Sequence, residues 1–73
     1  SIQVDRSYHG QGLGGTMMDR IEALANEKGM EGVELCVQET NLRARSFYQE
    51  RGYQPIWRKG SNVMMRKRLM SQG

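Results

Sequence analysis

Hydrophobic residues follow two different periods along the chain, and the changes between them predict six short elements. Ile2 and Val4 alternate with polar neighbours, which is typical of a strand over residues 2–5. From residue 13 onward, apolar residues recur every three or four positions and predict an amphipathic helix that Gly29 can end. Its apolar face is expected to contain Leu13, Met17, Met18, Ile21, Leu24 and Ala25, and its polar side Asp19, Arg20, Glu22 and Glu27.

A second strand follows, because residues 33–38 alternate between apolar and polar or small side chains. A strand, a helix and a strand in this order predict a right-handed parallel crossover. Asn41 is expected to cap a second, short helix that ends at Gly52. Two further strands are expected around Ile56 and over residues 63–69, joined by a turn at residues 60–62. The chain is therefore predicted to be α/β with the order β-α-β-α-β-β.

Length and composition limit what this chain can be. Its 73 residues form at most one domain with a thin core, and no apolar run is long enough to span a bilayer. The single Cys36 cannot form an internal disulfide, and no segment resembles a signal peptide, so we expect a reducing cytoplasm. One Cys and one His without ligand spacing give no support for a metal site.

A glycine-rich run lies directly before the first predicted helix. Four of the six residues from Gly10 to Gly15 are glycines, which let a ligand approach the backbone closely. The first turn of the helix offers unpaired N–H groups and the positive end of the dipole, so a phosphate group is the natural ligand. A P-loop is excluded because no Gly-Lys-Ser/Thr closes the run. The pattern G-x-G-x-x-G is present, but four residues separate the run from the strand, unlike in dinucleotide-binding folds.

Two blocks of sequence together resemble the GNAT N-acetyltransferase superfamily. The first is Val4-Asp5-x-x-Tyr8-His9-Gly10-Gln11-Gly12-Leu13-Gly14, which is similar to the loop that binds the pyrophosphate of acyl-CoA. The second is Leu35-x-Val37-x-x-x-Asn41-x-x-Ala44-x-x-x-Tyr48-x-x-x-Gly52-Tyr53, which resembles the later signature of the same family. Where the family usually has Arg or Gln at the start of the loop, this chain has His9.

The resemblance implies a fold and its extent. Residues 1–73 would form a single partial GNAT-like acetyl-CoA-binding domain, the C-terminal half of the fold, with a mixed sheet that contains a parallel, splayed strand pair. The part that shapes the acceptor site would be absent. A free edge on the first strand then predicts that a second copy or a missing N-terminal segment covers it.

The resemblance also implies the chemistry. An amine would attack the thioester of acetyl-CoA directly, with proximity and orientation supplying most of the rate. The expected cofactor-binding residues are Val4, His9, Gly10, Gln11, Gly12, Leu13, Gly14, Gly15, Thr16, Asn41 and Arg45. Tyr48 aligns with the family residue that protonates the departing thiolate, although packing of its ring beside Phe47 is the structural alternative. Neither the acceptor nor a general base is identified.

Two other functions remain open from the residues alone. The chain could be a non-catalytic module that binds CoA or another nucleotide. It could also be a small basic nucleic-acid-binding protein, because its net charge is +3 and five cations lie between Arg58 and Arg68. A solvated strand face explains those cations better, since only Trp57 offers a nearby stacking surface.

Overall fold

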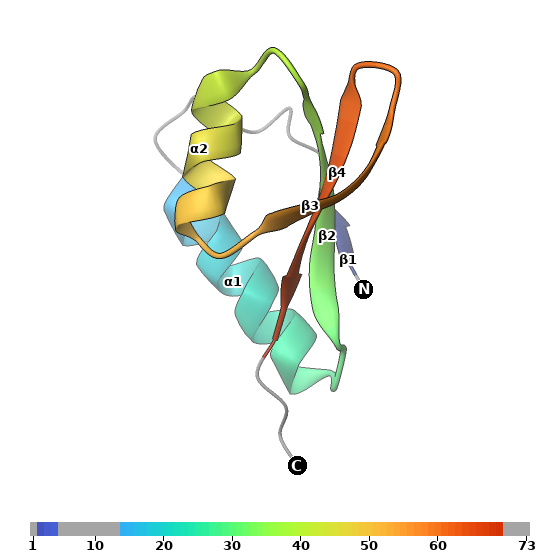
Figure 1. Cartoon of the computed structure of the whole chain (residues 1–73). Helices are drawn as coiled ribbons and strands as arrows, with labels where there is room; N and C mark the ends of the chain where they lie inside the picture. Colours follow the sequence, from blue (N-terminus) through green and yellow to red (C-terminus); the bar gives the residue numbers. More distant parts are fainter. Residues whose placement is uncertain (1, 5–13, 70–73) are drawn as a thin grey trace.

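Six elements make up the fold in the computed structural model, which describes residues 2–4 and 14–69 (Figure 1). The strands are β1 (Ile2–Val4), β2 (Gly32–Gln38), β3 (Gln54–Lys59) and β4 (Asn62–Arg68). The helices are α1 (Gly14–Glu27) and α2 (Leu42–Glu50). This order confirms the predicted α/β succession. Asp5, which the sequence pattern added to the first strand, lies outside the described residues.

The four strands form one sheet in the order β1-β2-β4-β3. β1 pairs in parallel with β2, with Val4 opposite Leu35, while β2 with β4 and β3 with β4 are antiparallel. The register between β3 and β4 shifts between Pro55 and Trp57, at a β-bulge. Pro55 lies on the edge strand, where a missing N–H donor is tolerated. The splaying apart of β1 and β2 stays a prediction.

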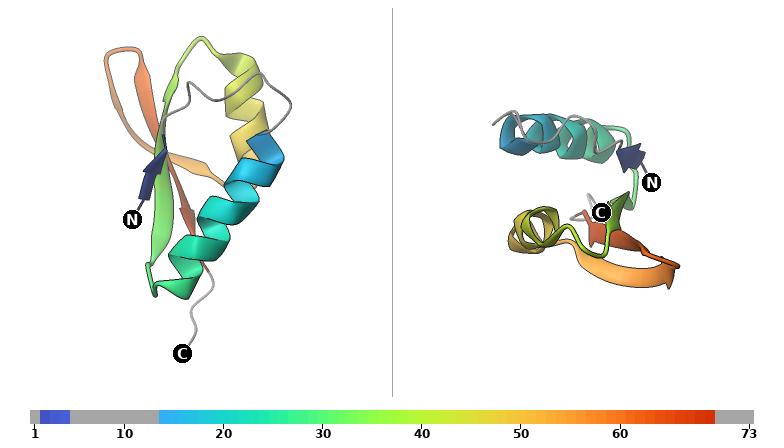
Figure 2. Two further views of the ribbon diagram at one scale, coloured as in Figure 1. Left: turned by 180° about the vertical axis from the view of Figure 1, so that it is seen from behind. Right: turned by 90° about the horizontal axis from the view of Figure 1, so that it is seen from above.

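Both helices cover the same face of this sheet, as two opposite views show (Figures 1 and 2). Among the residues whose burial the structure describes, the core between them contains nine side chains from α1, both central strands, α2 and the segment after it: Met18, Ala25, Val33, Leu35, Val37, Tyr48, Tyr53, Val63 and Met65. Alternate residues of β2 and β4 point into this core, as the two-residue period of a strand requires. The other face of the sheet carries no helix from the described residues.

The buried side of α1 differs from the predicted one. Met18 and Ala25 are buried and Ile21 packs against the core, but Leu24 is 47% exposed, so its place on the apolar face was predicted wrongly. Glu22, predicted on the polar side, is only 14% exposed at its side chain. The residues 18, 21, 22 and 25 form one helical stripe, and that stripe faces the sheet. Glu22 is accommodated there because cations and a hydroxyl meet it, as described below.

The predicted helix ends and turns are confirmed. The Asn41 side chain accepts a hydrogen bond from the Ala44 N–H at 3.1 Å and so caps α2. Gly29 and Gly52 follow the two helices with φ of 74° and 99°, a left-handed conformation that favours glycine. The hairpin between β3 and β4 turns at Gly60 and Ser61. No helix in the described ranges is long and apolar enough to cross a membrane.

Candidate functional site

The first turn of α1 contains three of the predicted cofactor-binding residues. The helix begins with Gly14, Gly15 and Thr16, and its first turn holds no acidic residue. A Cβ atom added to Gly15 would meet no atom within 4 Å, so nothing in the described residues fills the space beside this backbone. Unpaired N–H groups and the positive dipole end make such a turn attractive to an anion.

The rest of the predicted phosphate loop lies outside the described residues: His9, Gly10, Gln11, Gly12 and Leu13. Val4 ends β1, and its backbone lies beside Leu35 of β2 in the parallel pair. In a parallel crossover, the helix starts at the carboxyl ends of the strands it connects, so the end of β1 and the first turn of α1 belong to the same end of the sheet.

Three of the predicted residues share one side of α2. Asn41 is exposed at the N-terminus, Arg45 is half-buried one turn later, and Tyr48 is fully buried in the core. The Nε atoms of Arg45 and Arg51 are both buried without a hydrogen-bond partner among the described residues, so this feature does not single out Arg45 as an anion-binding residue.

The ring of Tyr48 packs between two other aromatic rings. Its centroid lies 5.1 Å from that of Phe47 and 5.6 Å from that of Tyr53, both in edge-to-face geometry. These contacts stabilise the core. The packing alternative weighed for Tyr48 is therefore present, and a catalytic role would add to this packing rather than replace it.

A carboxylate at the interface of α1 and the sheet was missed by the sequence reasoning. Oε1 of Glu22 accepts a hydrogen bond from Nζ of Lys67, and Oε2 accepts one from the Tyr53 hydroxyl, each at 2.8 Å. Nη2 of Arg51 lies 3.4 Å from Oε2 of Glu22 and donates to Asp19 at 2.7 Å. This network, which we call the Glu22 cluster, joins α1 to β4 and to the segment after α2. The signal available in the sequence was the position of Glu22 four residues after Met18 and three before Ala25.

Burial and neighbouring charges shift the pKa values of the Glu22 cluster in opposite directions. Burial alone would raise the pKa of Glu22, but hydrogen bonds from Lys67 and Tyr53 and the positive charge of Arg51 together lower it. The pKa of Tyr53 is raised, first by burial and then by its hydrogen bond to the Glu22 carboxylate. Burial would lower the pKa of Arg51, yet Asp19 and Glu22 raise it. Glu22 and Arg51 are thus held in their charged forms and Tyr53 in its neutral form.

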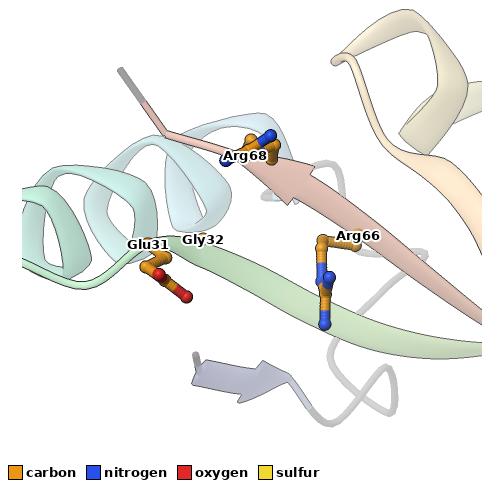
Figure 3. Close-up of a pocket in the computed structure, with 4 residues that line it drawn as sticks. All are labelled: Glu31, Gly32, Arg66 and Arg68. Carbon is orange, nitrogen blue, oxygen red and sulfur yellow. The ribbon is translucent and has the colours of Figure 1, made fainter. Parts of the chain in front are cut away.

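A separate pocket opens at the other end of the sheet (Figure 3). It is lined by Glu31, Gly32, Arg66 and Arg68, at the start of β2 and the end of β4. The start of α1 lies toward the carboxyl end of β2, so this pocket is not part of the predicted phosphate loop. Within the described residues, no group of three or more His, Cys, Asp or Glu side chains is arranged to hold a metal ion.

Comparison with known proteins gives the chain its family. The acetyltransferase (GNAT) family matches residues 1–53. A mycothiol acetyltransferase from Beutenbergia cavernae is 38% identical over 55 residues, which are 75% of this chain and 18% of that protein. Among solved structures, PH1933 from Pyrococcus horikoshii OT3 aligns with a TM-score of 0.73 and 28% identity, covering 92% of this chain and 42% of that one.

A second solved structure adds a ligand to the comparison. The PaiA N-acetyltransferase from Thermoplasma acidophilum in complex with coenzyme A aligns with a TM-score of 0.73 and 28% identity, over 84% of this chain and 38% of that one. The chain thus spans less than half the length of each of these three proteins. On the family match, the shared fold and the two signature blocks, this chain belongs to the acetyltransferase (GNAT) family.

Proposed function

We propose that this chain is the acetyl-CoA-binding part of an N-acetyltransferase that transfers the acetyl group directly to an amine. The observation that carries the proposal is the first turn of α1, which holds no acidic residue and where a Cβ on Gly15 would meet no atom of the described residues within 4 Å. A pyrophosphate needs close approach to backbone N–H groups at a helix N-terminus. A family member bound to coenzyme A has the same fold over 84% of this chain, which supports the same ligand here.

The residues would share the binding of acetyl-CoA. The amides of residues 11–15 and Thr16 would hold the pyrophosphate, with His9 and Arg45 supplying positive charge. The position of Arg45, half-buried on α2 one helical turn after Asn41, supports its part. Asn41, exposed at the start of α2, would contact the pantetheine arm in addition to capping the helix.

The rate of acetyl transfer would depend mainly on how the thioester and the amine are positioned relative to each other. Acetyl-CoA supplies an acetyl thioester, and holding it beside an amine converts a bimolecular reaction into an effectively unimolecular one. The Val4 backbone N–H would donate to the thioester oxygen as negative charge develops on it. Tyr48 would give its hydroxyl proton to the departing thiolate, since tyrosine and thiol pKa values are close enough for efficient transfer.

A non-catalytic CoA-binding module is the second candidate, because the chain spans less than half of its solved relatives. The nucleic-acid alternative has less support. Three cations of the basic C-terminal segment are paired with carboxylates: Arg58 with Glu39, Arg66 with Glu34, and Lys67 with Glu22. Paired cations contribute less to phosphate binding, which rests on free positive charge.

One calorimetric comparison separates these functions. Acetyl-CoA, NAD and a short DNA duplex are titrated in turn into the chain at one salt concentration. We expect heat of binding and a rise in melting temperature with acetyl-CoA. If DNA produces both signals and acetyl-CoA neither, the acyl-CoA proposal is wrong. Acetyl transfer to an added amine then distinguishes an active enzyme from a binding module.

The edge position of β1 supports one further part of the proposal. β1 pairs only with β2 in the described sheet, so its other edge can accept a strand from a second copy or from polypeptide outside these 73 residues. A stable monomer in sedimentation at micromolar concentration would count against a homodimer.

The free thiol of Cys36 supports placement in a reducing cytoplasm.

A further inference from the structure

The orientation of the Tyr48 ring depends on residues outside the predicted site. The ring is fully buried, so the side chains packed around it set its direction. One neighbour, Phe47, precedes it on α2. Another, Tyr53, lies after the helix, and its ring centroid is 5.6 Å from that of Tyr48 with 72° between the ring planes. Tyr53 is thus a contact through which other parts of the fold reach Tyr48.

The turn that ends α2 joins the two tyrosines through the backbone. Gly52 has φ of 99°, and its N–H donates to the Gln49 carbonyl at 3.0 Å. The Tyr53 N–H donates to the Tyr48 carbonyl at 2.9 Å. These two bonds form a Schellman motif, in which the residue after the glycine packs on the last turn of the helix. The turn therefore fixes the backbone of Tyr53 relative to Tyr48.

The Glu22 cluster fixes the side chain of Tyr53. Its hydroxyl donates to Oε2 of Glu22 at 2.8 Å, and Nζ of Lys67 donates to Oε1 of the same carboxylate at 2.8 Å. The same Nζ lies 5.9 Å from the centroid of the Tyr53 ring, within the range of a cation–π contact. Tyr53 is thus held at its backbone by the turn, at its hydroxyl by α1 and at its ring face by β4.

We propose that Tyr53, held by Glu22, is a positioning residue that orients Tyr48 for proton transfer to the departing thiolate. The inference rests on the proposed catalytic role of Tyr48. A proton donor must meet its acceptor at hydrogen-bond distance, and a displacement of about 1 Å can slow a reaction about 100-fold. Because Tyr53 is fixed at three points, its ring can hold the Tyr48 ring in one orientation.

Tyr53 keeps its own proton in this scheme. Its hydroxyl donates to the Glu22 carboxylate, and burial together with that carboxylate raises the pKa of Tyr53. Tyr48 instead shares one side of α2 with Asn41 and Arg45, two of the predicted cofactor-binding residues. The two tyrosines therefore have different roles, proton transfer for Tyr48 and orientation for Tyr53.

Tyr53→Phe tests the inference, because it keeps the ring and the turn and removes only the hydroxyl. Acetyl transfer to an added amine is measured with the full chain, and circular dichroism checks folding. We expect kcat to fall about fivefold with KM for acetyl-CoA unchanged. In a Tyr48→Phe background, the same substitution should change kcat less than about twofold, since Tyr53 acts through Tyr48. An equal loss in both backgrounds would mean that Tyr53 is only structural and would overturn the inference.

A matched pair of variants on α1 locates the contact. Glu22→Ala removes the acceptor of the Tyr53 hydroxyl, so it should lower kcat as much as Tyr53→Phe, with no further loss when the two are combined. Glu27→Ala, at an exposed position of the same helix, should leave kcat unchanged. If Glu22→Ala does not fold, Tyr53→Phe in the two backgrounds decides the matter.

The pH profile separates positioning from catalysis. Loss of the acid's proton lowers kcat at high pH, and this fall should persist in Tyr53→Phe and disappear in Tyr48→Phe. The reverse pattern would make Tyr53 the acid and overturn the inference. If the chain transfers no acetyl group, or Tyr48→Phe leaves transfer unchanged, the proposed role of Tyr48 is wrong and so is the inference. If Tyr48→Phe slows transfer and Tyr53→Phe does not, only the inference is wrong.

Discussion

Replacing Glu22 by glutamine should destabilise the fold by about 2 kcal/mol, because the carboxylate is the shared acceptor of the Glu22 cluster. Hydrogen bonds to charged groups contribute about 1.5–3 kcal/mol each. Lys67 is 29% exposed at its side chain, so water screens its share, whereas Tyr53 is 1% exposed. Glutamine keeps one acceptor oxygen for the Lys67 ammonium, and its NH₂ group can donate to the oxygen of the Tyr53 hydroxyl. The loss is therefore the contribution that the negative charge makes to both hydrogen bonds.

Thermal unfolding measures this loss. For a chain of this size, about 2 kcal/mol corresponds to a fall of about 8–16 °C in melting temperature. The matched control is Glu27→Gln, which removes the same charge from the same helix at an exposed position. It should change stability by less than about 0.5 kcal/mol. If the two variants melt at the same temperature, the Glu22 cluster does not hold α1 against the sheet.

The same perturbation has a predictable pH dependence. The pKa of Glu22 lies below its ordinary value of 4.5 in the folded state. A lowered folded pKa stabilises the fold above the unfolded pKa, and this stabilisation is lost as pH falls through the folded value. The difference between wild type and Glu22→Gln should thus be full at neutral pH and shrink below pH 4.5. A difference that is constant down to strongly acidic pH would contradict the assignment of charge to Glu22.

Three further substitutions test separate parts of the account. Gly32→Ala should destabilise the fold by about 1–3 kcal/mol in chemical denaturation, because its Cβ would lie 2.5 Å from the Lys67 carbonyl oxygen; a neutral effect would contradict the close strand approach. Asn41→Ala should lower stability by about 1 kcal/mol through loss of the α2 cap, with restoration by Asn41→Asp. Tyr48→Phe should slow acetyl transfer at least about tenfold with little change in acetyl-CoA affinity, and unchanged turnover would remove Tyr48 from the acid role.

Local signals were sufficient to predict the elements and their order. Alternation in β2, the cap at Asn41 and the glycines after both helices each specify conformation through nearby backbone geometry. Periodicity was less reliable for the orientation of α1. Leu24 was expected to be buried and is exposed, whereas Glu22 was expected to be exposed and is largely buried. Burial of Glu22 depends on hydrogen bonds from Tyr53 and Lys67, which lie far from it in the sequence. A single helix pattern cannot show that distant donors make a carboxylate tolerable inside the fold.

The sequence motifs predicted which helices carry the candidate site residues, but not how the side chains of those residues pack. Residues 14–16 form the start of α1, directly after the glycine run, as predicted, and Arg45 and Tyr48 follow Asn41 along α2. Family spacing did not reveal that Tyr48 is packed between two rings, since burial depends on which face of α2 meets the sheet. Nor did the sequence alone show the β-bulge between Pro55 and Trp57, which brings Trp57 opposite Met64.

Binding of acetyl-CoA to Gly15→Leu and to the wild-type chain tests the central claim most directly. No atom of the described residues lies within 4 Å of a Cβ on Gly15, and the Gly15 backbone is not in the left-handed region, so leucine should fit with stability changed by less than about 1 kcal/mol. If the pyrophosphate occupies that space, calorimetry should show binding to wild type and at least about tenfold weaker binding to the variant, or 1.4 kcal/mol. Equal affinities, or no binding of acetyl-CoA to the wild-type chain, would contradict the account.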